Sequence, residues 1–125
     1  SLENNINTSN VLFMSASGNH GLTSYERVFV LLKDSTFWEY FNDTELWSQK
    51  TDPPFNVNNV LFMSAAADGE DNDVERVFFL LDDGTFWEFY NFTGLWTQKT
   101  STPFNVSNRQ FRKTGLQSMD KKTVE

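Results

Sequence analysis

ERVFFLLDDGTFWEFYNFTGLW, residues 75–96, has a close copy in ERVFVLLKDSTFWEYFNDTELW, residues 26–47. The second copy starts 49 residues after the first. The alignment extends without a gap from residues 10–58 onto residues 59–107, and 29 of these 49 positions are identical. A repeat of this length is typical of propellers, solenoids and arrays. We therefore divide the chain into an N-terminal segment (1–9) that begins the first unit, repeat 1 (10–58), repeat 2 (59–107) and a C-terminal tail (108–125).

Each repeat contains four short stretches with the composition of β-strands. The predicted strands are residues 11–16, 27–32, 36–42 and 46–51 in repeat 1, and residues 60–65, 76–81, 85–91 and 95–100 in repeat 2. The first stretch of each repeat is continuously apolar, which predicts a strand buried on both faces. Turn residues such as Asp83-Gly84 separate the stretches, and prolines end each unit. Since no stretch has helical periodicity, we predict an all-β protein.

Four-stranded antiparallel units of this length are typical of β-propeller blades. Two blades do not close a ring, so we expect a six-bladed propeller completed by trimerisation of the chain. The alternative is an eight-stranded barrel or sandwich formed by one chain with a pseudo-twofold axis. Residues 109–125 depart from the repeat. They are interpreted either as an added strand containing Phe111 or as a solvated tail.

The composition excludes several classes of function. The chain has 10 Lys and Arg against 17 Asp and Glu, and its net charge of −7 argues against nucleic acid as a partner. Cysteine is absent, and the single histidine, His20, lies in an unrepeated loop, so we expect neither a metal site nor a cofactor. No apolar run approaches ~18 residues, so no membrane insertion is expected. The composition leaves the location open, with a secreted or cell-surface-facing protein slightly favoured.

Few polar residues inside the predicted strands are the same in both repeats. Among them are Arg27 and Arg76, Glu39 and Glu88, and Gln49 and Gln98. Because side chains alternate along a strand, Arg27 and Glu39 lie on apolar faces, and pairing of their strands brings them together. Such a pair, beside an aromatic side chain, could bind a sugar through its hydroxyl groups and its apolar face. It could equally be a structural ion pair that fixes the strand register.

The spacing of these residues resembles a known family. Arg-Val-aromatic, a Glu twelve residues after the Arg and a Trp eight residues after the Glu are similar to a blade of the six-bladed fucose-binding lectins. That family includes the orange-peel mushroom lectin and two-blade bacterial relatives that trimerise. The matching residues, all within residues 10–107, are Arg27, Glu39 and Trp47 in repeat 1 and Arg76, Glu88 and Trp96 in repeat 2.

The resemblance implies a non-catalytic, multivalent lectin that binds fucosylated glycans or glycoproteins as a homotrimer. Its Arg and Glu residues would hydrogen-bond the sugar, and Trp47 or Trp96 would cover its apolar side, often from the next blade. Trp38 and Trp87 are further candidates for this aromatic wall. A glycosidase needs two differentiated carboxylates at one bond, whereas each repeat offers one Glu beside an Arg, so we do not expect an enzyme.

Two alternatives remain open. Residues 79–89, FLLDDGTFWEF, are also similar to hemopexin-type blades, four of which form a propeller, so the chain could be a dimeric module that binds a protein or a small ligand. The other alternative is a purely structural repeat. The chain also contains four formal glycosylation acceptors, Asn7, Asn42, Asn91 and Asn105.

Overall fold

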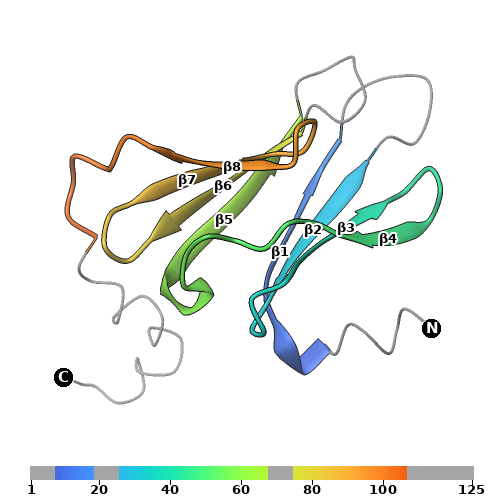
Figure 1. Ribbon diagram of the computed structural model, residues 1–125, viewed down its shortest axis with the longest axis horizontal. Coiled ribbons are helices and arrows are strands. Elements are labelled where there is room, and N and C mark those ends of the chain that lie inside the picture. The colour runs from blue at the N-terminus through green and yellow to red at the C-terminus, as the bar shows by residue number, and fades with distance from the viewer. Residues whose placement is uncertain (1–7, 19–25, 68–74, 107–125) are drawn as a thin grey trace, which may run out of the picture.

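The computed structural model describes residues 8–18, 26–67 and 75–106, which form two separate four-stranded antiparallel sheets (Figure 1). The first sheet has the order β1-β2-β3-β4 and the second β5-β6-β7-β8, so neighbours in sequence are neighbours in space. The strands are β1 (Val11–Ser17), β2 (Arg27–Leu32), β3 (Phe37–Phe41), β4 (Leu46–Gln49), β5 (Val60–Ala66), β6 (Arg76–Leu81), β7 (Phe86–Tyr90) and β8 (Leu95–Lys99).

The predicted all-β fold with four strands in each repeat is confirmed. Short 3-10 helices, η2 (Thr8–Asn10) and η3 (Val57–Asn59), lead into β1 and β5. Asn56 caps η3 by accepting a hydrogen bond from the backbone N–H of Asn58, 3.0 Å away. In the part of the chain that the structure describes, neither sheet closes on itself. The proposed strand at Phe111, the loop of His20 and the rest of the tail lie outside the described residues.

Each repeat has two turns in which one residue adopts the left-handed backbone conformation. In repeat 2 these residues are Gly84 (φ 86°) and Gly94 (φ 72°), whereas repeat 1 has Ser35 (φ 73°) and Glu45 (φ 60°) at the equivalent positions. Glycine adopts this conformation without the steric cost that a Cβ atom adds. The first repeat therefore carries backbone strain that the second repeat avoids.

Replacing Glu45 by glycine should raise the free energy of unfolding by about 1 kcal/mol. Relief of the backbone strain stabilises the folded chain by more than the added entropy of glycine stabilises the unfolded chain. The reciprocal change, Gly94→Ala, should lower it by a similar amount, since nothing lies within 4 Å of the added Cβ and only the backbone conformation is affected. Denaturant unfolding of both variants measures these changes. Equal stability of Glu45→Gly and wild type would contradict the strain.

Each sheet has two chemically distinct faces, set by the alternation of side chains. We call one the Arg face. Its members are Arg27, Phe29, Leu31, Phe37 and Glu39 in the first sheet and Arg76, Phe78, Leu80, Phe86 and Glu88 in the second. We call the other the Trp face. Its members are Val28, Val30, Trp38, Tyr40 and Trp47 in the first sheet and Val77, Phe79, Trp87, Phe89 and Trp96 in the second.

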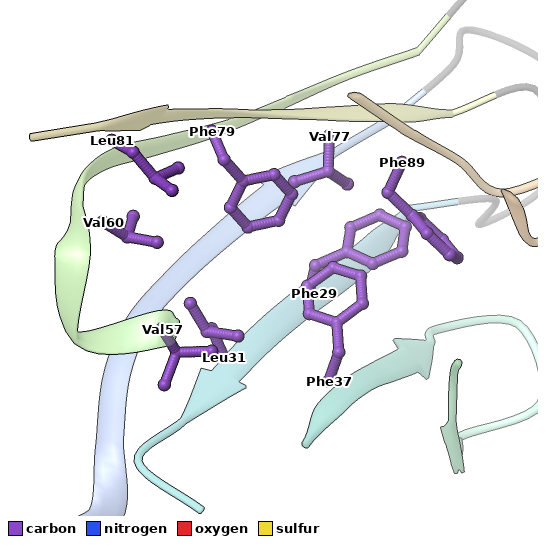
Figure 2. Close-up of a cluster of buried hydrophobic side chains, with 9 residues drawn as sticks. All are labelled: Phe29, Leu31, Phe37, Val57, Val60, Val77, Phe79, Leu81 and Phe89. Carbon is purple, nitrogen blue, oxygen red and sulfur yellow. The ribbon is translucent and has the colours of Figure 1, made fainter. Parts of the chain in front are cut away.

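The two sheets stack with the Arg face of the first sheet against the Trp face of the second. Figure 2 shows the buried side chains between them, in which Phe29, Leu31 and Phe37 meet Val77, Phe79, Leu81 and Phe89, with Val57 and Val60 at the side of the linker. Phe37 contacts Phe79, Phe89 and Trp96, with ring centroids 5.1–5.6 Å apart. The first strands of the sheets, β1 and β5, lie against each other (Figure 1), and Ser15 Oγ accepts a hydrogen bond from the Ala65 backbone N–H at 3.0 Å.

The stacking overturns two expectations. A pseudo-twofold axis would bring equivalent faces together, but unlike faces meet, so the sheets follow each other in the same sense. The apolar runs of β1 and β5 are also not buried on both sides, since Met14 is 69% exposed and Phe62 46% exposed. The reason is geometric, because among the described residues each sheet is covered by the other on one face.

Candidate functional site

The pairing of β2 with β3 brings Arg27 and Glu39 together, as the sequence predicted. Glu39 lies opposite Phe29, two residues along β2 from Arg27 and on the same face, and the guanidinium Nη1 donates to Glu39 Oε2. The guanidinium carbon also lies 3.8 Å from the ring centroid of Phe41, the cross-strand neighbour of Arg27. A cation over an aromatic face is attracted by the ring quadrupole. The position of Arg27 is therefore fixed from two sides.

Residues of the second sheet complete this site. Arg27 Nε donates to Glu75 Oε2 at 3.0 Å, and the Asn91 side-chain amide donates to Glu39 Oε2 at 3.2 Å and to Glu75 Oε1 at 3.3 Å. Glu75 directly precedes β6 and Asn91 directly follows β7. We call Arg27, Glu39, Glu75 and Asn91 the inner cluster. It joins the two sheets through charge-assisted hydrogen bonds, which are stronger than neutral ones.

The inner cluster is closed to solvent. The exposed fractions of the Arg27, Glu39 and Glu75 side chains are 5%, 6% and 0%. The second oxygen of Glu39 accepts from Lys50 Nζ and Ser48 Oγ, both at 3.2 Å. A sugar could reach Arg27 and Glu39 only by displacing Glu75 and Asn91. This arrangement corresponds to the interpretation of the pair as structural.

The charge balance of the inner cluster controls the protonation of Glu39. Burial by itself raises the pKa of this carboxyl group, but the hydrogen bond from Arg27 and the positive charges of Lys50 and Arg27 outweigh burial. The net effect is a pKa below the ordinary value of 4.5. Glu39 therefore remains ionised in the folded protein at neutral and mildly acidic pH.

The equivalent pair in repeat 2, Arg76 and Glu88, is more accessible. Arg76 Nη1 donates to Glu88 Oε2 at 2.8 Å, and Lys99 Nζ lies 3.7 Å from Glu88 Oε1. The side chains of Arg76 and Glu88 are 36% and 10% exposed. The guanidinium carbon of Arg76 lies 3.9 Å from the ring centroid of Tyr90, which repeats the contact of Arg27 with Phe41. We call Arg76 and Glu88 the outer pair.

The tryptophans lie on the opposite face from the Arg and Glu of their own sheet. Trp47 pairs with Tyr40 on the Trp face of the first sheet, and Trp38 lies on the same face. Trp96 and Trp87 face the first sheet across the interface, where Trp96 packs on Phe37. Trp96 and the Arg27–Glu39 pair thus both lie between the two sheets. No Trp of the second sheet lies on the face of the outer pair.

Two members of the inner cluster were missed by sequence reasoning. Glu75 lies just before its predicted strand, and Asn91 is the last residue of the predicted strand 85–91 but was considered only as a glycosylation acceptor. The signal was nevertheless present, because Glu26 and Asn42 are the same residues at the equivalent positions of repeat 1. Asn91 is buried, so this formal glycosylation acceptor is not accessible in the folded chain, whereas Asn42 is exposed.

The dependence of the unfolding free energy on pH should reveal how much the Glu39 carboxylate stabilises the fold. Because its pKa in the folded protein is below its unfolded value, its contribution is fully present above about pH 4.5 and is lost as the pH falls through the folded pKa. The unfolding free energy of the wild-type protein should therefore fall as the pH is lowered from about 5. That of Glu39→Gln should fall less over the same range. Denaturant unfolding at a series of pH values measures both slopes. Identical slopes would show that Glu39 does not contribute.

The two arginines form a matched pair for mutagenesis. Arg27→Met should lower the unfolding free energy by about 3–5 kcal/mol, because it leaves buried carboxylates without their counter-ion. Arg76→Met should cost about 1 kcal/mol or less, because the outer pair is partly solvated. Chemical denaturation of both variants measures the difference. Similar losses for both would contradict a special structural role for the inner cluster.

The described residues hold no group of three His, Cys, Asp or Glu side chains arranged to bind a metal ion. Within the same residues, no helix has the length and apolar character needed to cross a membrane. Comparison of the chain with protein-family models, curated proteins and solved structures gives no match.

Proposed function

We propose that this chain is a non-catalytic carbohydrate-binding module and that the outer pair is its sugar site. The observation that carries the proposal is the contrast between the repeats. Both contain the same Arg–Glu pair on an aromatic face, yet the side chain of Arg76 is 36% exposed and that of Arg27 is 5% exposed. An arginine that solvent can reach, paired with a largely buried carboxylate and next to apolar rings, offers the chemistry that a sugar requires.

The groups around the outer pair provide each part of a sugar contact. The guanidinium of Arg76 donates to hydroxyl and ring oxygens, and the carboxylate of Glu88 accepts from hydroxyl groups. Phe78 and Phe86, whose rings stack with centroids 5.7 Å apart, are half-buried on the same face and offer an apolar surface. These rings take the place of the tryptophan wall that the sequence resemblance implies. Fucose is the sugar that this resemblance favours.

The inner cluster has a different part in this proposal. Its Arg–Glu pair is sealed by Glu75 and Asn91, and its contacts bridge the two sheets. We assign it to holding the sheets in their stacked arrangement, which corresponds to the alternative of a purely structural repeat. The two copies of one motif then serve two purposes. One stabilises the stack and the other remains accessible to a ligand.

The proposal also includes the assembly of the sheets as propeller blades. Its support is the stacking of unlike faces in the same sense, with the first strand of each sheet next to that of its neighbour. Sheets related in this way can continue around an axis, and a heterologous contact that closes forms a ring. Three chains would supply six blades, the number in the lectins that the sequence resembles.

Calorimetric titration with L-fucose tests the sugar site, with galactose and mannose as comparison sugars. Wild-type protein should give saturable heat for fucose with one site per chain. Arg76→Ala and Glu88→Gln should weaken binding by at least tenfold, since hydrogen bonds to charged groups contribute about 1.5–3 kcal/mol.

Gln98→Ala is the matched control, because Gln98 is exposed on β8 next to Thr97 but lies on the Trp face rather than the Arg face. It should bind fucose as wild type does. Unchanged binding in Arg76→Ala would remove the outer pair from the site. Absence of heat for all three sugars with folded protein would overturn the proposed function.

A further inference from the structure

We propose that the glycan bound at the outer pair carries an anionic group, a sulfate or a carboxylate, and that Lys99 binds this group. The inference rests on the proposed function, since it names the class of sugar that the outer pair takes. Lys99 makes an additional contact beside Arg76 and Glu88, and both of these remain open to the sugar ring. The support comes from the position of Lys99, its exposure and the contrast with its equivalent in repeat 1.

Lys99 lies at one corner of the surface that the proposed sugar covers. The strand register arranges the Arg face of the second sheet in three cross-strand rows. The first row is Arg76, Tyr90 and Leu95, the second is Phe78, Glu88 and Thr97, and the third is Leu80, Phe86 and Lys99. Glu88 therefore occupies the middle of the face, with Arg76 and Lys99 at opposite corners. A sugar ring over Phe78 and Phe86 would have a cation on either side.

Lys99 has the charge and the exposure that are needed to bind an anion. Its side chain is 45% exposed, and its Nζ lies 3.7 Å from Glu88 Oε1, which is an ion-pair distance but too long for a hydrogen bond. The other oxygen, Glu88 Oε2, accepts from Arg76 Nη1 at 2.8 Å, so the carboxylate is already held by Arg76. A lysine ammonium offers three N–H donors, and an anionic oxygen accepts charge-assisted hydrogen bonds. The Lys99 ammonium can therefore turn towards a ligand without breaking a hydrogen bond to Glu88.

The equivalent lysine of repeat 1 is in a different state. Lys50 Nζ donates to Glu39 Oε1 at 3.2 Å, and its side chain is 21% exposed. Ser48 Oγ donates to the same oxygen, also at 3.2 Å, so two donors share it. In repeat 2, Thr97 takes the place of Ser48 and is exposed. The lysine is thus hydrogen-bonded within the chain where the motif is structural, and accessible where the motif is the proposed binding site.

The position of β8 leaves room for a substituent on the sugar. In the described part of the chain, β8 is the last strand in the order β5-β6-β7-β8 and forms one edge of the sheet. Thr97 and Lys99 are two residues apart on this strand, so they share a face, and both are exposed. A glycan that leaves the rings of Phe78 and Phe86 across this edge passes both side chains. The ammonium of Lys99 and the hydroxyl of Thr97 would donate to its sulfate or carboxylate oxygens.

The charge of the chain as a whole opposes an anionic ligand. The net charge is −7, so an anion is repelled until salt screens the repulsion. At physiological salt, exposed charges farther apart than about 8 Å are largely screened, whereas the contact of an anion with Lys99 is direct. An anionic group therefore adds affinity at a position where a cation adjoins the sugar, as Lys99 does.

Calorimetric titration with matched neutral and anionic sugars tests this contact. L-fucose is compared with its monosulfate esters, and a neutral fucosylated oligosaccharide is compared with the counterpart that carries a carboxylate-bearing sugar. At about 0.15 M salt, an anionic sugar of at least one pair should bind wild-type protein about fivefold more tightly than its neutral partner, which is the gain expected of a solvent-accessible ion pair. The sulfate and carboxylate pairs decide which anion the site takes.

Variants of Lys99 show whether this residue is responsible. Lys99→Gln removes the charge and should bring the ratio of anionic to neutral affinity close to one, whereas Lys99→Arg keeps the charge and should retain most of the preference. Lys33→Gln is the matched control, because it removes one positive charge from an exposed turn of the first sheet and should keep the wild-type ratio. A merely structural role of Lys99 would change both affinities together and leave their ratio unaltered. Circular dichroism and thermal unfolding establish that each variant is folded.

The outcomes separate this inference from the proposed function. If wild type binds neutral and anionic sugars equally, or if folded Lys99→Gln keeps the wild-type ratio, the role of Lys99 is wrong, while heat for neutral fucose still supports the proposed function. Absence of heat for every neutral and anionic sugar would overturn both. Heat for anionic sugars alone, lost in Arg76→Ala and in Lys99→Gln, would overturn neutral fucose as the ligand and support the anionic class.

Discussion

The stacking of the two described sheets depends on the placement of Arg27 between two carboxylates from different sheets. A buried guanidinium is costly unless opposite charge and hydrogen-bond acceptors surround it. Glu39 supplies one carboxylate from the same sheet, and Glu75 supplies the other from the second sheet. Because both carboxylates contact Arg27 only when the sheets are stacked as described, the polar cluster favours this relative position of the sheets. The aromatic core provides most of the apolar burial, and the cluster determines how its surfaces are aligned.

The same motif takes on different properties in the two repeats because its surroundings differ. In the first repeat, the Arg face is covered by the second sheet, and the pair becomes part of a structural cluster. In the second repeat, the side chain of Arg76 is partly exposed, and we propose this pair as a ligand site. Two copies of one sequence can therefore specialise without a change in the motif itself. Accessibility alone separates a structural ion pair from a candidate binding site.

Stacking of unlike faces also makes the two ends of the stack chemically different. If equivalent faces had met, both Arg faces would be buried together and the chain would be complete. With unlike faces in contact, one face of each kind remains at the ends of the stack. Glu26 and Asn42 mark one end, and Arg76 and Glu88 mark the other. The proposed sugar site lies at the second end.

The sequence by itself determined the secondary structure and much of the pairing. The strict repeat, the turn signals at Asp34-Ser35 and Asp83-Gly84, and the alternation of side chains specified four strands per unit and placed Arg27 beside Glu39. These features are local, so they follow from neighbouring residues. Only the tertiary structure decided which faces stack and that Glu75 and Asn91 close the first pair. Those outcomes depend on contacts between residues about 50 positions apart in the chain. Such contacts are set by the packing of whole surfaces and by charge compensation between the sheets, which the pattern within one repeat does not encode.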